Sequence, residues 1–323
     1  MVDSRQVGGL STWWRLGRDG WKAVLKSTAA QFKADQVPNL AALVTLRLVL
    51  ALVPSLIAAV AIIAQVTSPA DIERLVIAAE EFIPEQSREF VVDTLDNILD
   101  DDSGGWASVI GVVVGLFAAS SAAAALVKAL NTAYGAGEGR GFVGQRLVSL
   151  AIVAAVVVTL AGMFLALVLG PSLMAWLLPE VLLDSPIRYL ITIGRYMAAA
   201  TLLALFFGLT FRLGPDRDQR RLHPLTPGAV LGVSGWLLLS YVFSLYIRIA
   251  GNFAVYGAAA GVVILLIWMN YSFTVLLMGA ELDHEIERYV AAADPAASRH
   301  GTPAGPDPAE VEADAPDQAR ARR

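Results

Sequence analysis

The chain has 323 residues, of which 56% are hydrophobic and 16% are charged, with a mean hydropathy of +0.59 and no cysteine. Soluble domains carry about 25% charged residues, so a soluble fold of this size would have no dry interior for so much leucine, valine and alanine. The lack of cysteine excludes a disulfide scaffold, and the net charge of −5 argues against a general nucleic-acid binder. The composition indicates an integral membrane protein.

The first predicted element is an amphipathic helix over residues 11–34, within an N-terminal segment that covers residues 1–39. Its apolar positions recur at helical spacing, and lysine and arginine supply the polar side. The apolar positions are Trp14, Trp21, Val24, Leu25, Thr28 and Phe32. We expect this helix to lie in the cytoplasmic membrane interface, either as a simple anchor or as a sensor of anionic lipid.

Six later stretches are apolar and long enough to cross a hydrocarbon core of about 30 Å, which takes about 20 helical residues. They are Leu40–Val66, Trp106–Val127, Leu147–Leu178, Tyr189–Leu213, Thr226–Ala250 and Tyr256–Ala280. Gly162 and the Gly170-Pro171 pair predict a tilt or kink in the third. We therefore predict an all-α domain over residues 40–290, a bundle of six transmembrane helices, followed by a disordered cytoplasmic tail over residues 291–323.

Residues 67–105, between the first two spans, predict two short amphipathic helices in an outer loop. Ser68-Pro69 is typical of a helix N-cap followed by proline at the first helical position. The loop ends in Asp100-Asp101-Asp102, which lacks the alternating oxygen ligands of a calcium loop. We interpret this run as a solvated acidic face, and the sequence predicts no metal site.

Lysine and arginine predict the orientation, because they concentrate in loops on the cytoplasmic side of a membrane. They are frequent in the N-terminal segment and after the second and fourth spans, and scarce in the alternate loops. Both termini are therefore expected in the cytoplasm.

Pairs of small residues four apart occur in three of the spans. These pairs are Gly111/Gly115, Gly228/Gly232 and Gly257/Gly261. Small side chains let helix backbones approach closely inside a membrane. We expect the pairs to serve helix packing within the bundle, with formation of a homo-oligomer as the alternative.

Polar residues inside predicted spans are candidates for function, because an unpaired polar group in hydrocarbon is costly. Arg47 lies about 10 Å into the first span, where it snorkels to the headgroups, pairs with Glu281 or contacts an anionic substrate. Pro54 is expected to kink the same span. Asn270 begins a polar stretch with Tyr271, Ser272 and Thr274, which either bonds to neighbouring helices or lines a cavity.

A weak sequence similarity relates the two halves of the chain. Asn131 precedes Tyr134-Gly135 after the second span, and Asn252 precedes Tyr256-Gly257 after the fifth. Inverted repeats of three spans are common in secondary transporters. Because the two spacings differ by one residue, coincidence remains the favoured alternative to a repeat.

Signals for an enzyme are poor. Glu281 and His284 have the Glu-x-x-His spacing of di-iron bundles, but those sites need a second copy of the motif and further carboxylates. We interpret this motif as the solvated exit of the sixth span. The chain also lacks a phosphate-binding Gly-Lys-Ser/Thr loop and a nucleophile elbow, so we predict neither an enzyme nor a cofactor.

Several residue blocks together resemble the YihY/BrkB family of bacterial inner-membrane proteins over roughly residues 20–290. The first half contributes Ala41-Ala42-Leu43 through Leu52-Val53-Pro54, Leu130-Asn131-x-x-Tyr134-Gly135, and Arg140. The second half contributes Pro227-Gly228-Ala229, Trp236, Ser240, Phe243-Ser244-x-Tyr246, Tyr256-Gly257, Leu266-x-Trp268 and Gly279-Ala280-Glu281-Leu282. The chain departs from the family pattern at Leu46 and Arg47, where an aromatic pair is expected.

The resemblance implies a six-helix protein of the bacterial inner membrane. Members have carried a ribonuclease label, a virulence label and a proposed role in moving envelope lipids. Our hypothesis is a transporter-like protein for a lipid or other amphipathic envelope component, with membrane lipids as partners; the alternative is a scaffold that transports nothing. The candidate transport or gating residues are Arg47, Pro54, Asn131, Asn252, Tyr256, Trp268, Asn270 and Glu281.

Overall fold

The computed structural model describes residues 16–66, 106–170, 187–217, 226–250 and 257–292, and these are helical apart from short connections. The helices are α1 (Arg18–Ala34), α2 (Val37–Val66), α5 (Trp106–Ala133), α6 (Phe142–Phe164), the π-helical turn η2 (Leu165–Leu169), α9 (Ile187–Leu213), α10 (Pro227–Ala250) and α11 (Gly257–Ala292). The predictions for the outer loop 67–105, for the tail beyond residue 292 and for Asn252 and Tyr256 fall outside the described residues.

Five described helices are long and apolar enough to cross a membrane: α5, α6 continued by η2, α9, α10 and α11. A sixth candidate is made by α1 and α2, which are bent by 58° at their junction. The prediction of an all-α, multi-pass membrane protein is confirmed. The helix α11 extends twelve residues past the predicted end of its span at Ala280, and the third predicted span passes into a π-helical turn before Gly170.

The helix α1 packs against the last turns of α11. Its buried residues are Gly20, Val24 and Thr28, and Val24 joins Leu282 and Ile286 of α11 in one apolar cluster. The amphipathic helix predicted for residues 11–34 is confirmed from Arg18 onward, while residues 11–15 are not described. Its apolar face is thus covered at least in part by protein.

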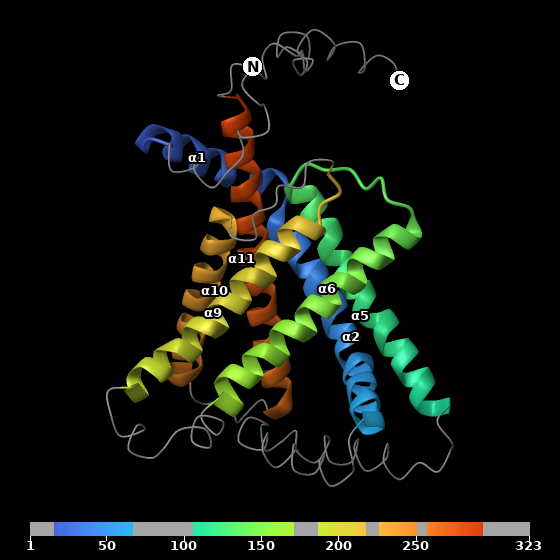
Figure 1. The fold of residues 1–323 in the computed structure, drawn as a ribbon. Coiled ribbons are helices and arrows are strands. Elements are labelled where there is room, and N and C mark those ends of the chain that lie inside the picture. Colours follow the sequence, from blue (N-terminus) through green and yellow to red (C-terminus); the bar gives the residue numbers. More distant parts are fainter. Residues whose placement is uncertain (1–15, 67–105, 171–186, 218–225, 251–256, 293–323) are drawn as a thin grey trace, which may run out of the picture.

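The helices that run most nearly upright in Figure 1 are α2, α5, α10 and α11, and α6 and α9 cross in front of them. The most extensive helix contacts are those of α2 with α5, of α10 with α11 and of α11 with α2. The starts of α2, α6 and α10 and the ends of α5, α9 and α11 gather at the end of the bundle that carries α1 (Figure 1). We call this the α1 end.

Most buried apolar side chains of the described residues lie toward the α1 end. They include Val37, Ala41 and Val44 of α2, Leu126, Val127, Ala129 and Leu130 of α5, Phe207 and Phe211 of α9, Ala229 and Val233 of α10, and Leu276, Leu277 and Ala280 of α11. Toward the opposite end, the five consecutive residues Ser244–Arg248 of α10 are all exposed. Five residues cover more than one turn of 3.6, so every side of α10 is at least partly exposed there.

Three of the paired glycines, Gly115, Gly228 and Gly232, lie where two helices pack closely. A Cβ at Gly115 would lie 2.5 Å from the carbonyl oxygen of Pro54 on α2, and a Cβ at Gly232 would lie 2.8 Å from the ring of Phe207 on α9. Gly228 meets the carbonyl of Gly279 on α11. Gly261 differs, because a Cβ there would have no described atom within 4 Å.

Candidate functional site

The segment Asn131 to Ala136 ends α5 with a backbone turn that orients several polar side chains. The N–H of Ala136 donates to the carbonyl of Asn131 at 2.8 Å, and the N–H of Gly135 donates to that of Thr132 at 2.9 Å. These two bonds form a Schellman motif. Gly135 has φ of +58°, the left-handed conformation that glycine adopts without a Cβ penalty. The Asn-x-x-Tyr-Gly spacing noted in the sequence is therefore a helix C-cap.

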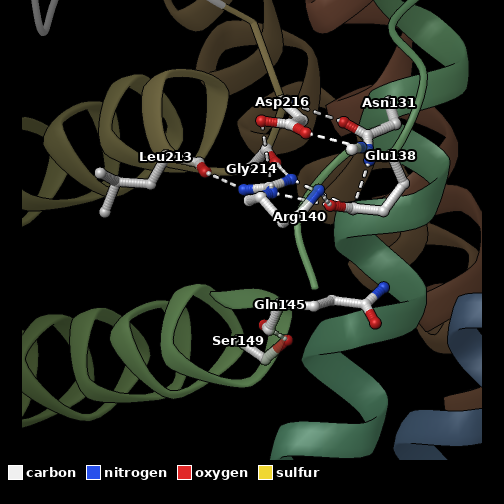
Figure 2. A network of polar contacts seen from close by, with 9 residues as sticks. Asn131, Glu138, Arg140, Gln145, Ser149, Leu213, Gly214 and Asp216 are labelled. Carbon is white, nitrogen blue, oxygen red and sulfur yellow. Dashed lines mark hydrogen bonds and ion pairs between the residues drawn. The ribbon is translucent and has the colours of Figure 1, made fainter. Parts of the chain in front are cut away.

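Arg140, in the connection from α5 to α6, joins that connection to the end of α9 (Figure 2). Its guanidinium donates to the carbonyls of Leu213 at 3.3 Å and Gly214 at 2.7 Å. The same group forms ion pairs with Glu138 at 2.8 Å and Asp216 at 3.6 Å. The Arg140 side chain is 12% exposed, so most of these contacts are shielded from water. One side chain thus satisfies two helix-terminal carbonyls and two carboxylates.

Asn131 completes the network from the end of α5. Its amide donates to Glu138 at 2.8 Å and accepts a bond from the backbone N–H of Asp216 at 2.7 Å. The carboxylate of Asp216 accepts a bond from the N–H of Gly139 at 2.7 Å (Figure 2). We call Asn131, Glu138, Arg140 and Asp216 the α5–α9 network. It holds the two connections together and lies at the α1 end.

A second contact joins the end of α9 to α11 through Arg217. This guanidinium pairs with Glu287 at 2.6 Å and lies 4.2 Å from the centre of the Tyr134 ring. The Tyr134 ring in turn meets His284 edge to face, with centroids 5.9 Å apart. Arg217 therefore fixes α11 against the ends of both α5 and α9.

The Tyr134 phenol is held in its neutral form. Burial raises its pKa well above the ordinary value of 10.0, and the nearby Asp283 carboxylate raises it further, whereas Arg217 lowers it. Because the first two effects dominate, Tyr134 remains protonated throughout the physiological pH range.

The start of α10 is capped from its own chain and from α11. The hydroxyl of Thr226 accepts the N–H of Ala229 at 3.0 Å, and Pro227 occupies the first helical position. Asp283 of α11 accepts the N–H of Gly228 at 2.6 Å. A carboxylate is favourable there because a helix N-terminus carries partial positive charge.

The acidic run on α11 is buried, so the interpretation of Glu281 to His284 as a solvated exit of the span is wrong. Glu281, Asp283 and Glu285 are 0%, 4% and 3% exposed. Residues four apart lie on the same face of a helix, so Glu281 and Glu285 face one way and Asp283 faces α10. The charged run is covered because α1, α2 and α10 all pack around this part of α11.

The eight candidate residues are not brought together at one site. Arg47 is exposed and forms no ion pair among the described residues, so its predicted pairing with Glu281 is not found. Pro54 is half-buried where α2 touches Gly115, and Asn131 belongs to the α5–α9 network. The backbone carbonyl of Asn270 accepts a bond from Thr274 at 2.8 Å.

Trp268 belongs to a separate contact between α10 and α11. Its ring meets that of Trp236 edge to face, with centroids 5.8 Å apart. The indole N–H of Trp236 donates to Ser272 at 3.2 Å. The polar stretch of the sixth span therefore bonds to a neighbouring helix at Ser272, whereas Tyr271 is 54% exposed.

Several important side chains were not singled out from the sequence. They are the carboxylates Asp35, Glu138, Asp216, Asp283 and Glu287. Glu138 and Asp216 each lie within two residues of an arginine that had been explained by topology alone. A carboxylate so close to an arginine in the sequence could have indicated an ion pair. It does not show which distant part of the chain each carboxylate contacts.

The described residues include no group of three or more histidine, cysteine, aspartate or glutamate side chains placed to hold a metal ion. Glu138, Asp216 and Glu287 instead pair with arginines of the chain, and Asp283 accepts an N–H at the start of α10. These ion pairs and hydrogen bonds hold the helix ends together at the α1 end.

The apolar helices and this fastened end define a multi-pass helical membrane protein. The profile of the family described as "Virulence factor BrkB" matches residues 28–302, and the chain belongs to that family. The resemblance inferred from the residue blocks is thereby confirmed.

Two relatives illustrate the similarity. The chain is 27% identical over 205 residues to YfkH of Bacillus subtilis (strain 168), named as ribonuclease-like, an alignment that covers 63% of this chain and 74% of the relative. It is 36% identical over 86 residues to the UPF0761 membrane protein IL2447 of Idiomarina loihiensis, covering 26% of this chain and 30% of that protein. No solved structure matches the chain.

Proposed function

We propose that the protein is a transporter-like protein of the bacterial inner membrane that handles a lipid or another amphipathic envelope component. The observation that carries this proposal is the unequal packing of the two ends. The α1 end holds most of the buried apolar core, the α5–α9 network and the Arg217 contact. Among the described residues, the halves of α9 and α10 farther from the α1 end expose large side chains, such as Tyr189, Met197 and Tyr241. We infer that the fastened α1 end is the closed one and that the other end opens to substrate, as alternating access requires.

Charge supports an orientation with the α1 end in the cytoplasm. Arg18, Lys22, Lys26 and Lys33 are exposed on α1, and Lys128 is exposed near the end of α5. Positive residues of this kind concentrate on the cytoplasmic side of bacterial inner membranes. The proposed closed end therefore faces the cytoplasm, and the open end faces outward.

The exposed surface of α10 and α11 supports an amphipathic substrate. Tyr241 and Ser244 of α10 and Tyr271 of α11 are exposed among leucine and valine side chains. A polar group facing pure hydrocarbon is costly, whereas a molecule with both polar and apolar parts offers it partners. A surface that mixes hydroxyl and apolar groups suits such a molecule.

The ribonuclease-like name of the Bacillus relative is not carried over to this chain, and we propose no enzymatic activity. Asp216 and Glu287 pair with arginines, and Asp283 accepts a backbone N–H of α10. These carboxylates are therefore committed to helix ends instead of converging on a phosphodiester.

Flux in proteoliposomes tests transport. The full chain is reconstituted with fluorescent phospholipids of several headgroups, and loss of fluorescence to a membrane-impermeant quencher is timed against protein-free vesicles. We expect faster movement with the protein, and slower movement when Tyr271→Leu and Ser244→Leu remove exposed hydroxyls. The matched control is Val158→Leu on the exposed apolar face of α6. If no headgroup moves faster than in protein-free vesicles, transport is wrong and a scaffold role is favoured.

A further inference from the structure

Glu281 of α11 is buried without a partner that neutralises it. The residue is 0% exposed, and neither carboxylate oxygen receives a hydrogen bond from an N–H or O–H group of the described chain. An isolated ionised carboxylate in such a place is costly, and it ordinarily pairs with a cation or takes up a proton.

The group that faces Glu281 is a second carboxyl, that of Asp35. Asp35 lies in the turn between α1 and α2, both of which pack against α11, and its half-buried carboxyl interacts with that of Glu281 by hydrogen bonding and by charge. Asp35 ends α1, where its backbone N–H donates to the carbonyl of Gln31 at 2.8 Å. Gln36 follows with φ of +50°, so the turn between α1 and α2 is tight and sets where the Asp35 side chain lies.

None of the surrounding helices brings a buried positive charge to this pair. The charged residues of α2, α5 and α10 are Arg47, Lys128 and Arg248 respectively, and all three are exposed. Those of α1 are Arg18, Asp19, Lys22, Lys26 and Lys33, and all five are exposed as well.

On α11 itself, the next charge along this face is also negative. Glu285 acts on Glu281 by repulsion and forms its own ion pair with Arg288 at 3.2 Å, whose side chain is 61% exposed. The environment of Glu281 is therefore acidic on both its own helix and the facing turn.

Asp35 is half-buried, whereas Glu281 is fully buried, so Glu281 is the carboxyl whose ionised form is costly at this site. When one proton is held between them, one carboxyl donates an O–H···O⁻ bond to the other, which is among the stronger hydrogen bonds of proteins. A single proton thus converts the repulsion between Asp35 and Glu281 into a bond.

We propose that Asp35 and Glu281 form a proton-binding site that fastens the α1–α2 turn to α11. Val37, two residues after Asp35, and Ala280, next to Glu281, are both 0% exposed and belong to one apolar core. Loss of the proton leaves two negative charges facing each other, and the turn then moves away from α11. The inference goes beyond the proposed transport, because the pair binds its proton whether or not any lipid moves.

Infrared difference spectroscopy on the full chain in nanodiscs tests the bound proton. Near neutral pH we expect the C=O stretching band of a protonated carboxylic acid, lost as the pH is raised. Glu281→Gln and Asp35→Asn each weaken this band, whereas Asp19→Asn, at an exposed acidic position of α1, leaves it unchanged. A band absent from the wild type, or present equally in both site variants, overturns the proposal.

Distances between spin labels test whether the Asp35–Glu281 pair holds the α1–α2 turn against α11. The chain has no cysteine, so single cysteines at Lys22 and Lys128, both exposed, give a specific label pair. We expect the distance distribution between them to broaden as the pH is raised in the wild type and to stay narrow in Glu281→Gln, whose neutral amide still donates to Asp35. The same broadening in Glu281→Gln would show that the pair does not hold the turn. The lipid flux experiment is independent, so each proposal can fail alone.

Discussion

Gly228 of α10 and Gly279 of α11 meet backbone to backbone. A Cβ on Gly279 would lie 2.6 Å from the carbonyl oxygen of Gly228, and a Cβ on Gly228 would overlap the carbonyl of Gly279. The same approach brings the Gly228 N–H to Asp283 at 2.6 Å. Small residues at this crossing therefore allow both the van der Waals contact and the cap on α10.

We expect Gly228→Ala to destabilise the protein by at least about 1–3 kcal/mol, the usual cost of overpacking. The new methyl group would strike backbone atoms, which cannot move aside as the end of a flexible side chain can. Thermal unfolding in detergent measures the effect. Gly261→Ala on α11 is the control, because no described atom lies within 4 Å of a Cβ there. Equal unfolding temperatures for the two variants would contradict the close approach.

Gly135→Ala is expected to lower stability by about 1–2 kcal/mol. The cause is conformational: φ of +58° costs an L-residue with a Cβ about that much. Gly135→Asn is expected to cost less, since asparagine tolerates this conformation better than alanine. Gly137→Ala, where a Cβ meets nothing within 4 Å, is the control. If both alanine variants unfold alike, the α5 cap does not depend on glycine.

Removal of Arg140 by Arg140→Ala is expected to cost about 2–4 kcal/mol, because it leaves Glu138 and Asp216 without their cation. The cost falls short of that of a fully buried pair, since these carboxylates are 27% and 25% exposed. Arg140→Lys keeps the charge but loses the forked donor geometry, so an intermediate loss is expected. Chemical denaturation measures all three proteins, and a lysine variant as stable as the wild type would show that charge alone suffices.

The raised pKa of Tyr134 predicts that the protein loses stability at alkaline pH. Its pKa in the folded protein lies above the ordinary value of 10.0, so the folded state holds its proton more tightly than the unfolded chain does. The stabilising contribution is complete below pH 10 and is lost as the pH rises above that value toward the folded pKa. Unfolding temperatures measured against pH should therefore fall less steeply in Tyr134→Phe, which cannot ionise. An identical slope in both proteins would contradict the raised pKa.

Tyr134→Phe also distinguishes the contribution of the aromatic ring to stability from that of the hydroxyl. Arg217 lies over the face of Tyr134 at 4.2 Å, a cation–π contact worth about 0.5–2 kcal/mol. At neutral pH, Tyr134→Phe keeps this contact and should cost little, whereas Tyr134→Leu should lose it. Denaturation of both variants checks the difference, which should be smaller in an Arg217→Gln background.

The sequence by itself determined the class of fold. Runs of apolar residues long enough to cross a hydrocarbon core exclude a soluble chain, and helix is the form in which a single span satisfies its own backbone. The local spacing of apolar and basic residues likewise indicated the amphipathic nature of α1, whereas the Asn131 to Gly135 block was noted as a weak repeat and a family resemblance and not as the helix C-cap that it forms.

Only the tertiary structure decided which polar side chains meet. Arg47 and Glu281 were matched by their expected depth, yet Arg47 is exposed and Glu281 faces Asp35. Depth along a helix follows from residue number, whereas direction around the helix depends on which neighbours pack against it. The burial of Glu281 and Asp283 likewise follows from α1, α2 and α10 closing around α11, a packing arrangement that no local pattern in the sequence records.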